Sequence, residues 1–104
     1  MIPMFFFFLL HGPVQAAPTF SSINETILKA SCVGCHGGAE PKGKIDLTSY
    51  DKVIASGTVT KFKPMESKLF LAVDSADMPP EGPALGSAQL DELYIWIKEG
   101  ANDN

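Results

Sequence analysis

Arginine is absent from this sequence of 104 residues, and histidine, cysteine and tryptophan are scarce. All eight basic residues are lysines, and twelve acidic residues outnumber them, which gives a formal net charge of −4. Nucleic-acid-binding domains usually carry a stripe or patch of clustered basic residues. An acidic chain without arginine is a poor candidate for such binding, so we expect no nucleic-acid partner.

The sequence also lacks an apolar run long enough to cross a bilayer. Residues 2–10 are almost entirely apolar, and a Gly-Pro break and a small-residue segment follow them. A membrane-spanning helix needs about 20 apolar residues, whereas this pattern is typical of a signal peptide. We expect a signal peptide over residues 1–16, cleaved after Ala16 or Ala17, and export to the periplasm. The mature domain, residues 17–104, would then have no membrane span, and we expect it to be a monomer.

The mature part carries no strand-like alternation of apolar and polar residues, so we expect an all-α fold. Turn and capping signals divide it into about four short helices with long loops, one of them the proline-rich segment 74–86. So small a domain buries only a modest core, and we expect its loops to wrap around something that staples it. The helix signals are a Ser22–Glu25 capping box before a helix that runs to Cys32, a Thr48-Ser49 cap with a stop at Gly57, a proline start at Pro64 for a helix over 64–73, and a Ser87 cap with a stop at Gly100.

One motif can supply that staple, because Cys32, Cys35 and His36 form a Cys-x-x-Cys-His sequence. Two thiols three positions apart can each add to a vinyl group of haem, and the adjacent histidine is then placed under the iron. We therefore expect one covalent haem c, attached through both cysteines and ligated by His36. Three nearby glycines either let the backbone approach the porphyrin or merely turn the loop: Gly34, Gly37 and Gly38.

Three other interpretations of the cysteine pair stay open. A thioredoxin-like redox pair would begin a helix after a strand, whereas these cysteines end a predicted helix. A zinc site would need a second pair of ligands, which the sequence lacks. A structural disulfide across so short a loop would stabilise the domain comparatively little.

The second iron ligand must come from a short list of residues. His11 lies in the expected signal peptide, which leaves His36 as the single histidine of the mature domain. Of the two methionines in that domain, Met65 has helical spacing with Leu69 and resembles core filler. Met78 precedes two prolines in a stretch that cannot be helical, so its thioether can be held in place. We expect His36/Met78 ligation, with Met65 or an open or water-filled position as the alternatives.

Taken together, these segments resemble class I cytochromes c, most closely the planctomycete-type cytochrome c domains. The resemblance covers nearly the whole mature chain, and its specific part is the haem pentapeptide. It implies a small class I cytochrome c fold around one haem, with His36 and Met78 as the axial pair. The terminal helices would cross near the haem, with Tyr94 and Trp96 at the contact or simply in the core. The segments that carry the resemblance are 31–37, 45–47, 64–69, 78–80 and 90–101.

These observations predict an electron carrier rather than an enzyme. Histidine and methionine ligation raises the reduction potential and favours electron transfer over oxygen chemistry. The alternative is a haem-based sensor, or a subunit of a haem enzyme, with a displaceable Met78. The partners would be redox donor and acceptor proteins. An acidic docking surface on the partner would suit four lysines beside the loops expected to line the haem: Lys42, Lys44, Lys61 and Lys63.

Overall fold

The computed structural model describes residues 17–80 and 82–104. The expected signal peptide, residues 1–16, lies outside the described residues. Every regular element in the described part is a helix, and no strand occurs there, in agreement with the predicted all-α class. No helix in these two ranges is both long and apolar enough to pass through a membrane.

The first helix begins earlier than the capping pattern predicted. Helix α2 (Phe20–Ile23) continues directly into η1 (Asn24–Cys32), a π-type helix. Its N-cap is Thr19, whose hydroxyl accepts from the Ser22 amide at 3.0 Å, while the Ser22 hydroxyl accepts from the Thr19 amide at 3.2 Å. The predicted Ser22–Glu25 box is therefore wrong. Glu25 instead forms an ion pair with Lys29 at 2.8 Å.

The short helix α3 (Tyr50–Ala55) has the ends predicted for it. The Ser49 hydroxyl accepts from the Lys52 amide at 3.2 Å and caps the first turn. Gly57 follows the helix with a φ of +75°, a left-handed conformation that glycine adopts at little cost.

The helix predicted over residues 64–73 is divided in two. A 3-10 turn, η3 (Pro64–Glu66), precedes α4 (Lys68–Asp74), and the intervening Ser67 has an extended backbone. The fully buried Ser67 hydroxyl accepts from the Thr60 amide and donates to the Lys63 carbonyl, both at 2.9 Å. These side-chain bonds to the backbone compete with a continuous helix.

The last helix, α5 (Ser87–Lys98), differs from its prediction by one residue at the start. Gly86 is the N-cap, and its amide donates to the Gln89 side chain at 3.0 Å, so Ser87 is the first helical residue and not the cap. Gly100 follows the helix with a φ of +118°, as its predicted role as a stop requires.

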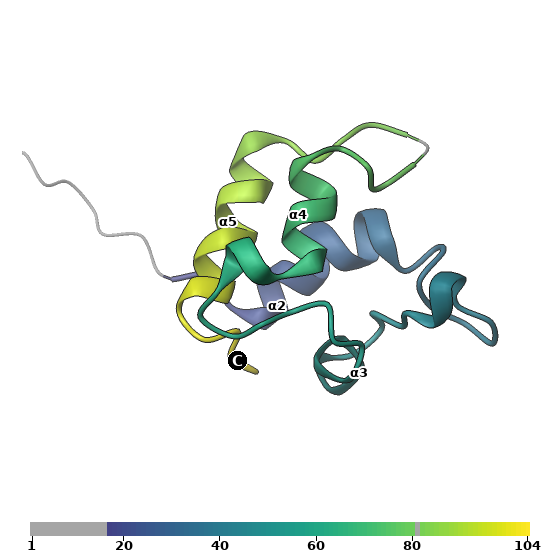
Figure 1. The fold of residues 1–104 in the computed structure, drawn as a ribbon, viewed down its shortest axis with the longest axis horizontal. Helices are drawn as coiled ribbons and strands as arrows, with labels where there is room; N and C mark the ends of the chain where they lie inside the picture. The colour runs from purple at the N-terminus through teal and green to yellow at the C-terminus, as the bar shows by residue number, and fades with distance from the viewer. Residues whose placement is uncertain (1–16, 81) are drawn as a thin grey trace, which may run out of the picture.

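The core lies where the first and last helices meet α4. Figure 1 shows α4 and α5 side by side, with α2 passing across them and α3 set apart at the edge. Full burial of a leucine or isoleucine side chain contributes about 1.5–3 kcal/mol. This packing leaves the two long loops, after η1 and after α4, at the same end of the molecule. The fully buried aliphatic residues include Ile23, Ile27, Leu28, Leu93 and Ile97.

Candidate functional site

The Cys-x-x-Cys-His motif forms a tight turn at the end of η1. The amides of Cys35 and His36 both donate to the Cys32 carbonyl, at 3.2 and 2.9 Å. Cys32 is buried, whereas Cys35 is exposed, and both thiols are free. The turn keeps the three residues close together at the end of η1, and all three line one cavity.

The loop after the motif holds the imidazole of His36 in one orientation. His36 Nδ1 lies 3.0 Å from the Lys42 carbonyl oxygen, which can only accept, so Nδ1 carries the proton. The backbone supports this arrangement, because the Lys42 amide donates to the Cys35 carbonyl at 2.7 Å and the Leu47 amide donates to the His36 carbonyl at 2.8 Å. Nε2 is then the nitrogen with a free lone pair. Histidines that ligate a metal through one ring nitrogen commonly donate a hydrogen bond from the other.

Met78 comes to the same place from the other long loop. Its amide donates to the Ala72 carbonyl at 3.1 Å, which ties the loop to the end of α4. The residue is 37% exposed, so its thioether is not packed as core.

Two cavities meet at these residues, and Cys32, His36 and Met78 line both of them. The large cavity, about 440 Å³, is on the solvent side, since many of its lining residues are exposed. The small cavity, about 140 Å³, is on the core side. Its lining is mostly apolar and includes Ile45, Leu47, Leu69, Ala72 and Val73.

The residues present suit a haem. Cofactor cavities typically measure about 300–1,000 Å³ and are mainly apolar with a few polar groups that orient the ligand. An imidazole and a thioether are the axial ligands of iron in cytochromes c. The two thiols of the motif stand beside the same space, and Lys29 and Lys42 lie at the solvent side of the large cavity.

The other methionine lies elsewhere. Met65 is 60% exposed and lines a separate depression together with Phe62, Tyr94 and Lys98. None of the motif residues lines that depression. The structure thus brings Met78, and not Met65, to the cavities that His36 lines.

The two aromatic residues singled out on α5 belong to the helix packing. The Trp96 indole is buried, donates to the Asn102 carbonyl at 3.0 Å, and lies 5.8 Å from the Phe20 ring. Tyr94 packs edge-on against Phe70 at 5.4 Å. Neither side chain lines the large or the small cavity. Trp96 belongs to the core, and the half-buried Tyr94 packs against it.

At two of the three positions near the motif, the polypeptide itself requires glycine. A Cβ at Gly37 would stand 2.7 Å from the Thr48 methyl and 2.9 Å from the Val33 carbonyl oxygen. Gly38 has a φ of +82°, which a loop turn requires. Gly34 has neither constraint, because a Cβ there would meet no atom within 4 Å, and it lines the large cavity.

The surroundings of the thiols do not suit a thioredoxin-like pair. Burial raises the pKa of the Cys32 thiol to about 11, whereas redox-active thiols need a lowered pKa. The motif also ends a helix and does not begin one. Among the described residues, no group of three or more histidine, cysteine, aspartate or glutamate side chains is arranged to hold a metal ion.

The four lysines expected beside the haem do not form one group. Lys42 lines the large cavity, and Lys44 belongs to the same turn, η2 (Lys42–Lys44). Lys61 instead lies over the Tyr50 ring, and Lys63 stands 4.0 Å from Glu66 beside the Met65 depression. Sequence reasoning missed Lys68, which lines the small cavity.

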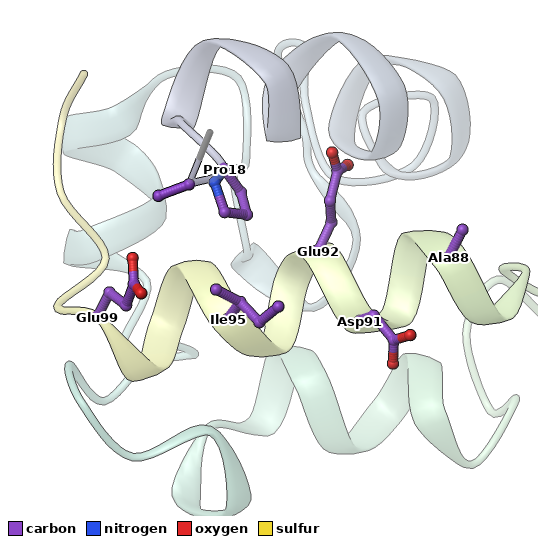
Figure 2. A pocket seen from close by; sticks show the side chains of 7 residues that line it. Pro18, Ala88, Asp91, Glu92, Ile95 and Glu99 are labelled. Atoms are coloured by element: carbon purple, nitrogen blue, oxygen red, sulfur yellow. The ribbon is translucent and has the colours of Figure 1, made fainter. Parts of the chain in front are cut away.

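A second depression, of about 460 Å³, lies on the outer face of α5 and contains none of the motif residues. Figure 2 shows Pro18 on one side, with Ile95 and three carboxylates projecting from the helix. Its acidic character, from Asp91, Glu92 and Glu99, contrasts with the lysines around the motif cavities.

Comparison with known proteins relates part of the chain to a protein family. No curated protein and no solved structure matches the chain. A family model described as Planctomycete cytochrome C matches residues 32–82. The matched segment starts at Cys32 and extends past Met78, so it includes the motif, the small-cavity lining and the methionine loop. Residues 32–82 are therefore similar to the planctomycete cytochrome c family, which is consistent with a cytochrome c-type domain.

Proposed function

We propose that this protein is an exported carrier of single electrons, with one covalent haem c ligated by His36 and Met78. The observation that supports this most directly is that Cys32, His36 and Met78 line the same two cavities, although Cys32 and His36 lie at and just after the end of η1 and Met78 lies in the loop after α4. The family match to a cytochrome c domain agrees with it.

Each residue has a distinct part in the proposal. Cys32 and Cys35 form the two thioether bonds, and haem c, when bound, supplies a one-electron redox centre. His36 offers Nε2 as a ligand because Nδ1 is hydrogen-bonded to the Lys42 carbonyl. Met78 offers its sulfur from the loop after α4. The apolar residues of the small cavity exclude water, which together with the methionine ligand favours a high reduction potential.

Export is part of the proposal. Residues 1–16 carry the pattern of a signal peptide, and covalent haem attachment is an extracytoplasmic process. The periplasm is therefore the compartment we propose. Sequencing the amino terminus of the haem-loaded protein checks it, with a start at Ala17 or Pro18 as the expected result and an intact Met1 as the contrary one.

The ligand assignment is tested by two matched methionine variants. In the wild-type protein, a reduced denatured haemochrome spectrum should report one covalent haem, and the oxidised protein should show the far-red sulfur-to-iron band. Met78→Leu should abolish that band and lower the reduction potential by on the order of 100 mV or more. Met65→Leu should change neither. Absence of covalent haem would refute the whole proposal, and loss of the band in the Met65 variant alone would reassign the ligand.

The same variants test the alternative of a sensor or enzyme with a displaceable methionine. Met78 is partly exposed, and the backbone bond from its amide to the Ala72 carbonyl ties the loop to α4. A carrier should bind carbon monoxide only after Met78 is replaced. If the reduced wild-type protein binds carbon monoxide readily at neutral pH, the displaceable-ligand function takes precedence.

We further propose that the redox partner presents an acidic surface to the solvent side of the large cavity. Lys29 and Lys42 line that cavity, and Lys44 lies two residues beyond Lys42. Of the four lysines predicted from the sequence, this surface keeps Lys42 and Lys44. Complementary charge at such a surface accelerates association and makes it sensitive to salt.

A further inference from the structure

One positively charged residue lines the small cavity, and the ligand assignment gives it no role. Its lining is apolar except for His36, Thr58 and Lys68. His36 is the proposed iron ligand. The Thr58 hydroxyl shares a hydrogen bond of 2.8 Å with the Ser56 hydroxyl. Lys68 is thus the lining residue whose charged group has no assigned role.

Lys68 is also not accounted for by the protein around it. Among the residues that the structure describes, no carboxylate lies within ion-pair distance of its ammonium group, whereas Lys29, Lys52 and Lys63 each have one. It stands at the first residue of α4, and a cation near the start of a helix is disfavoured by the helix dipole. Neither ion pairing nor helix stability therefore explains a lysine at this position.

The chemistry of haem supplies a partner. Haem is a flat apolar ring that carries two carboxylates on one edge, and an ionised carboxylate against apolar residues needs a positive charge or donors beside it. On the solvent side, water can meet that need. On the core side, the buried residues Leu47, Leu69 and Val73 cannot. Lys68 lines the cavity while the residue remains exposed, so its aliphatic stem can pack on the apolar wall with its ammonium group at the rim.

We propose that the Lys68 ammonium group binds one haem carboxylate at the rim of the small cavity. This inference rests on the proposed function, and it assigns the chain's own partner for the anionic edge of the cofactor. The contact orients the haem and also affects the redox equilibrium, because a nearby cation disfavours the more positive, oxidised iron. Lys68 is then both a haem-binding residue and a contributor to the potential.

The test is the reduction potential of three lysine variants, measured on haem-loaded protein. Lys68→Met removes the charge but keeps a stem of similar length, and Lys68→Arg keeps the charge. Lys61→Met is the matched control, because it makes the same change in net charge at an exposed lysine that lines neither cavity.

Lys68→Met should lower the equilibrium constant for reduction about threefold to tenfold. For one electron, this corresponds to a reduction potential lower by about 28 to 59 mV. Lys68→Arg and Lys61→Met should remain near the wild-type value. If Lys68→Met fails to load haem while Lys68→Arg loads it, the charge is again required and the proposal stands.

Two results would overturn the contact. One is a Lys68→Met potential equal to that of Lys61→Met. The other is equal loss of haem in the methionine and arginine variants, which would indicate a structural role. Failure of the proposed function is separate, because the wild-type protein would then lack covalent haem or the far-red band before any variant is compared.

Discussion

At the scale of single residues, Gly37 is the position after the motif that has the least room for change. The Val33 carbonyl oxygen would stand 2.9 Å from an added Cβ and belongs to the backbone, so it cannot rotate away as the Thr48 methyl could. The residue next to the proposed iron ligand is therefore held by contacts within the polypeptide. This explains the glycine without any contact to a porphyrin.

Gly37→Ala should lower the free energy of unfolding by about 1–3 kcal/mol, the usual cost of overpacking a filled site. Urea titration of the haem-loaded protein, followed by far-UV circular dichroism, measures this change. Gly34→Ala is the matched control, since a Cβ there meets nothing within 4 Å, and it should be neutral or slightly stabilising. An unchanged urea midpoint for Gly37→Ala would show that the loop moves to accommodate the added methyl group. Poor haem loading in Gly34→Ala would show that the porphyrin needs the space.

The sequence pointed to side chains that the structure brings to one cavity, but not to the groups that hold them there. Residue type and spacing singled out Cys32, Cys35, His36 and Met78, and all four line the large cavity. The group that orients His36 is the backbone carbonyl of Lys42. Because every residue has such a carbonyl, no residue type in the sequence marks this one as a hydrogen-bond partner.

At the scale of elements, the start of the first helix depends on a residue far away in the sequence. The Phe20 amide donates to the Asn104 side chain at 3.0 Å, and the Ser21 amide donates to the Asn104 carbonyl at 3.0 Å. Helix starts leave unpaired amides, and here Asn104 satisfies two of them. With Phe20 also packed against Trp96, the helix begins after Thr19 and not at the predicted Ser22.

Thr19→Ala should therefore destabilise the protein by about 1 kcal/mol, the usual effect of removing an N-cap. Glu25→Ala removes the partner of the box that was predicted but not formed, and it should cost only the exposed pair with Lys29, about 0.2–0.5 kcal/mol. Thermal unfolding of both variants beside the wild type ranks the two effects. If Glu25→Ala lost more stability than Thr19→Ala, Ser22 would be the N-cap, as the sequence predicted.

Helix ends that rest on local chemistry were predictable, and those that rest on distant contacts were not. Gly57 and Gly100 end their helices as expected, because a left-handed glycine is a local requirement. The break at Ser67 comes from bonds to Thr60 and Lys63 across a turn. From the sequence alone, a serine within a helix cannot be told apart from a serine whose buried hydroxyl bonds to the backbone across a turn.

At the scale of the whole molecule, charge is distributed unevenly despite the net value of −4. The depression on α5 gathers Asp91, Glu92 and Glu99, as Figure 2 shows. The motif cavities are instead lined by Lys29, Lys42 and Lys68, with no aspartate or glutamate among their described lining residues. The field near the proposed haem edge should therefore be positive, opposite in sign to the net charge of the protein.

The sign of the salt effect on small redox reagents distinguishes this local field from the net charge. Oxidation of the reduced protein by anionic hexacyanoferrate should slow several-fold as ionic strength rises toward 0.1 M, where the screening length is about 10 Å. A cationic ruthenium ammine complex should show the opposite trend. If the net charge governed the encounter, both signs would be reversed.

A matched pair of double variants locates the charges responsible. Lys42→Gln with Lys44→Gln should weaken or reverse the salt dependence, and it leaves the Lys42 carbonyl on His36 unchanged. Lys61→Gln with Lys63→Gln alters the net charge equally, but these lysines line neither motif cavity, so the salt dependence should persist. Stopped-flow rates at four or five ionic strengths are sufficient. Equal effects from the two pairs would mean that electrons do not enter beside Lys42, and the acidic docking surface proposed for the partner would have no support.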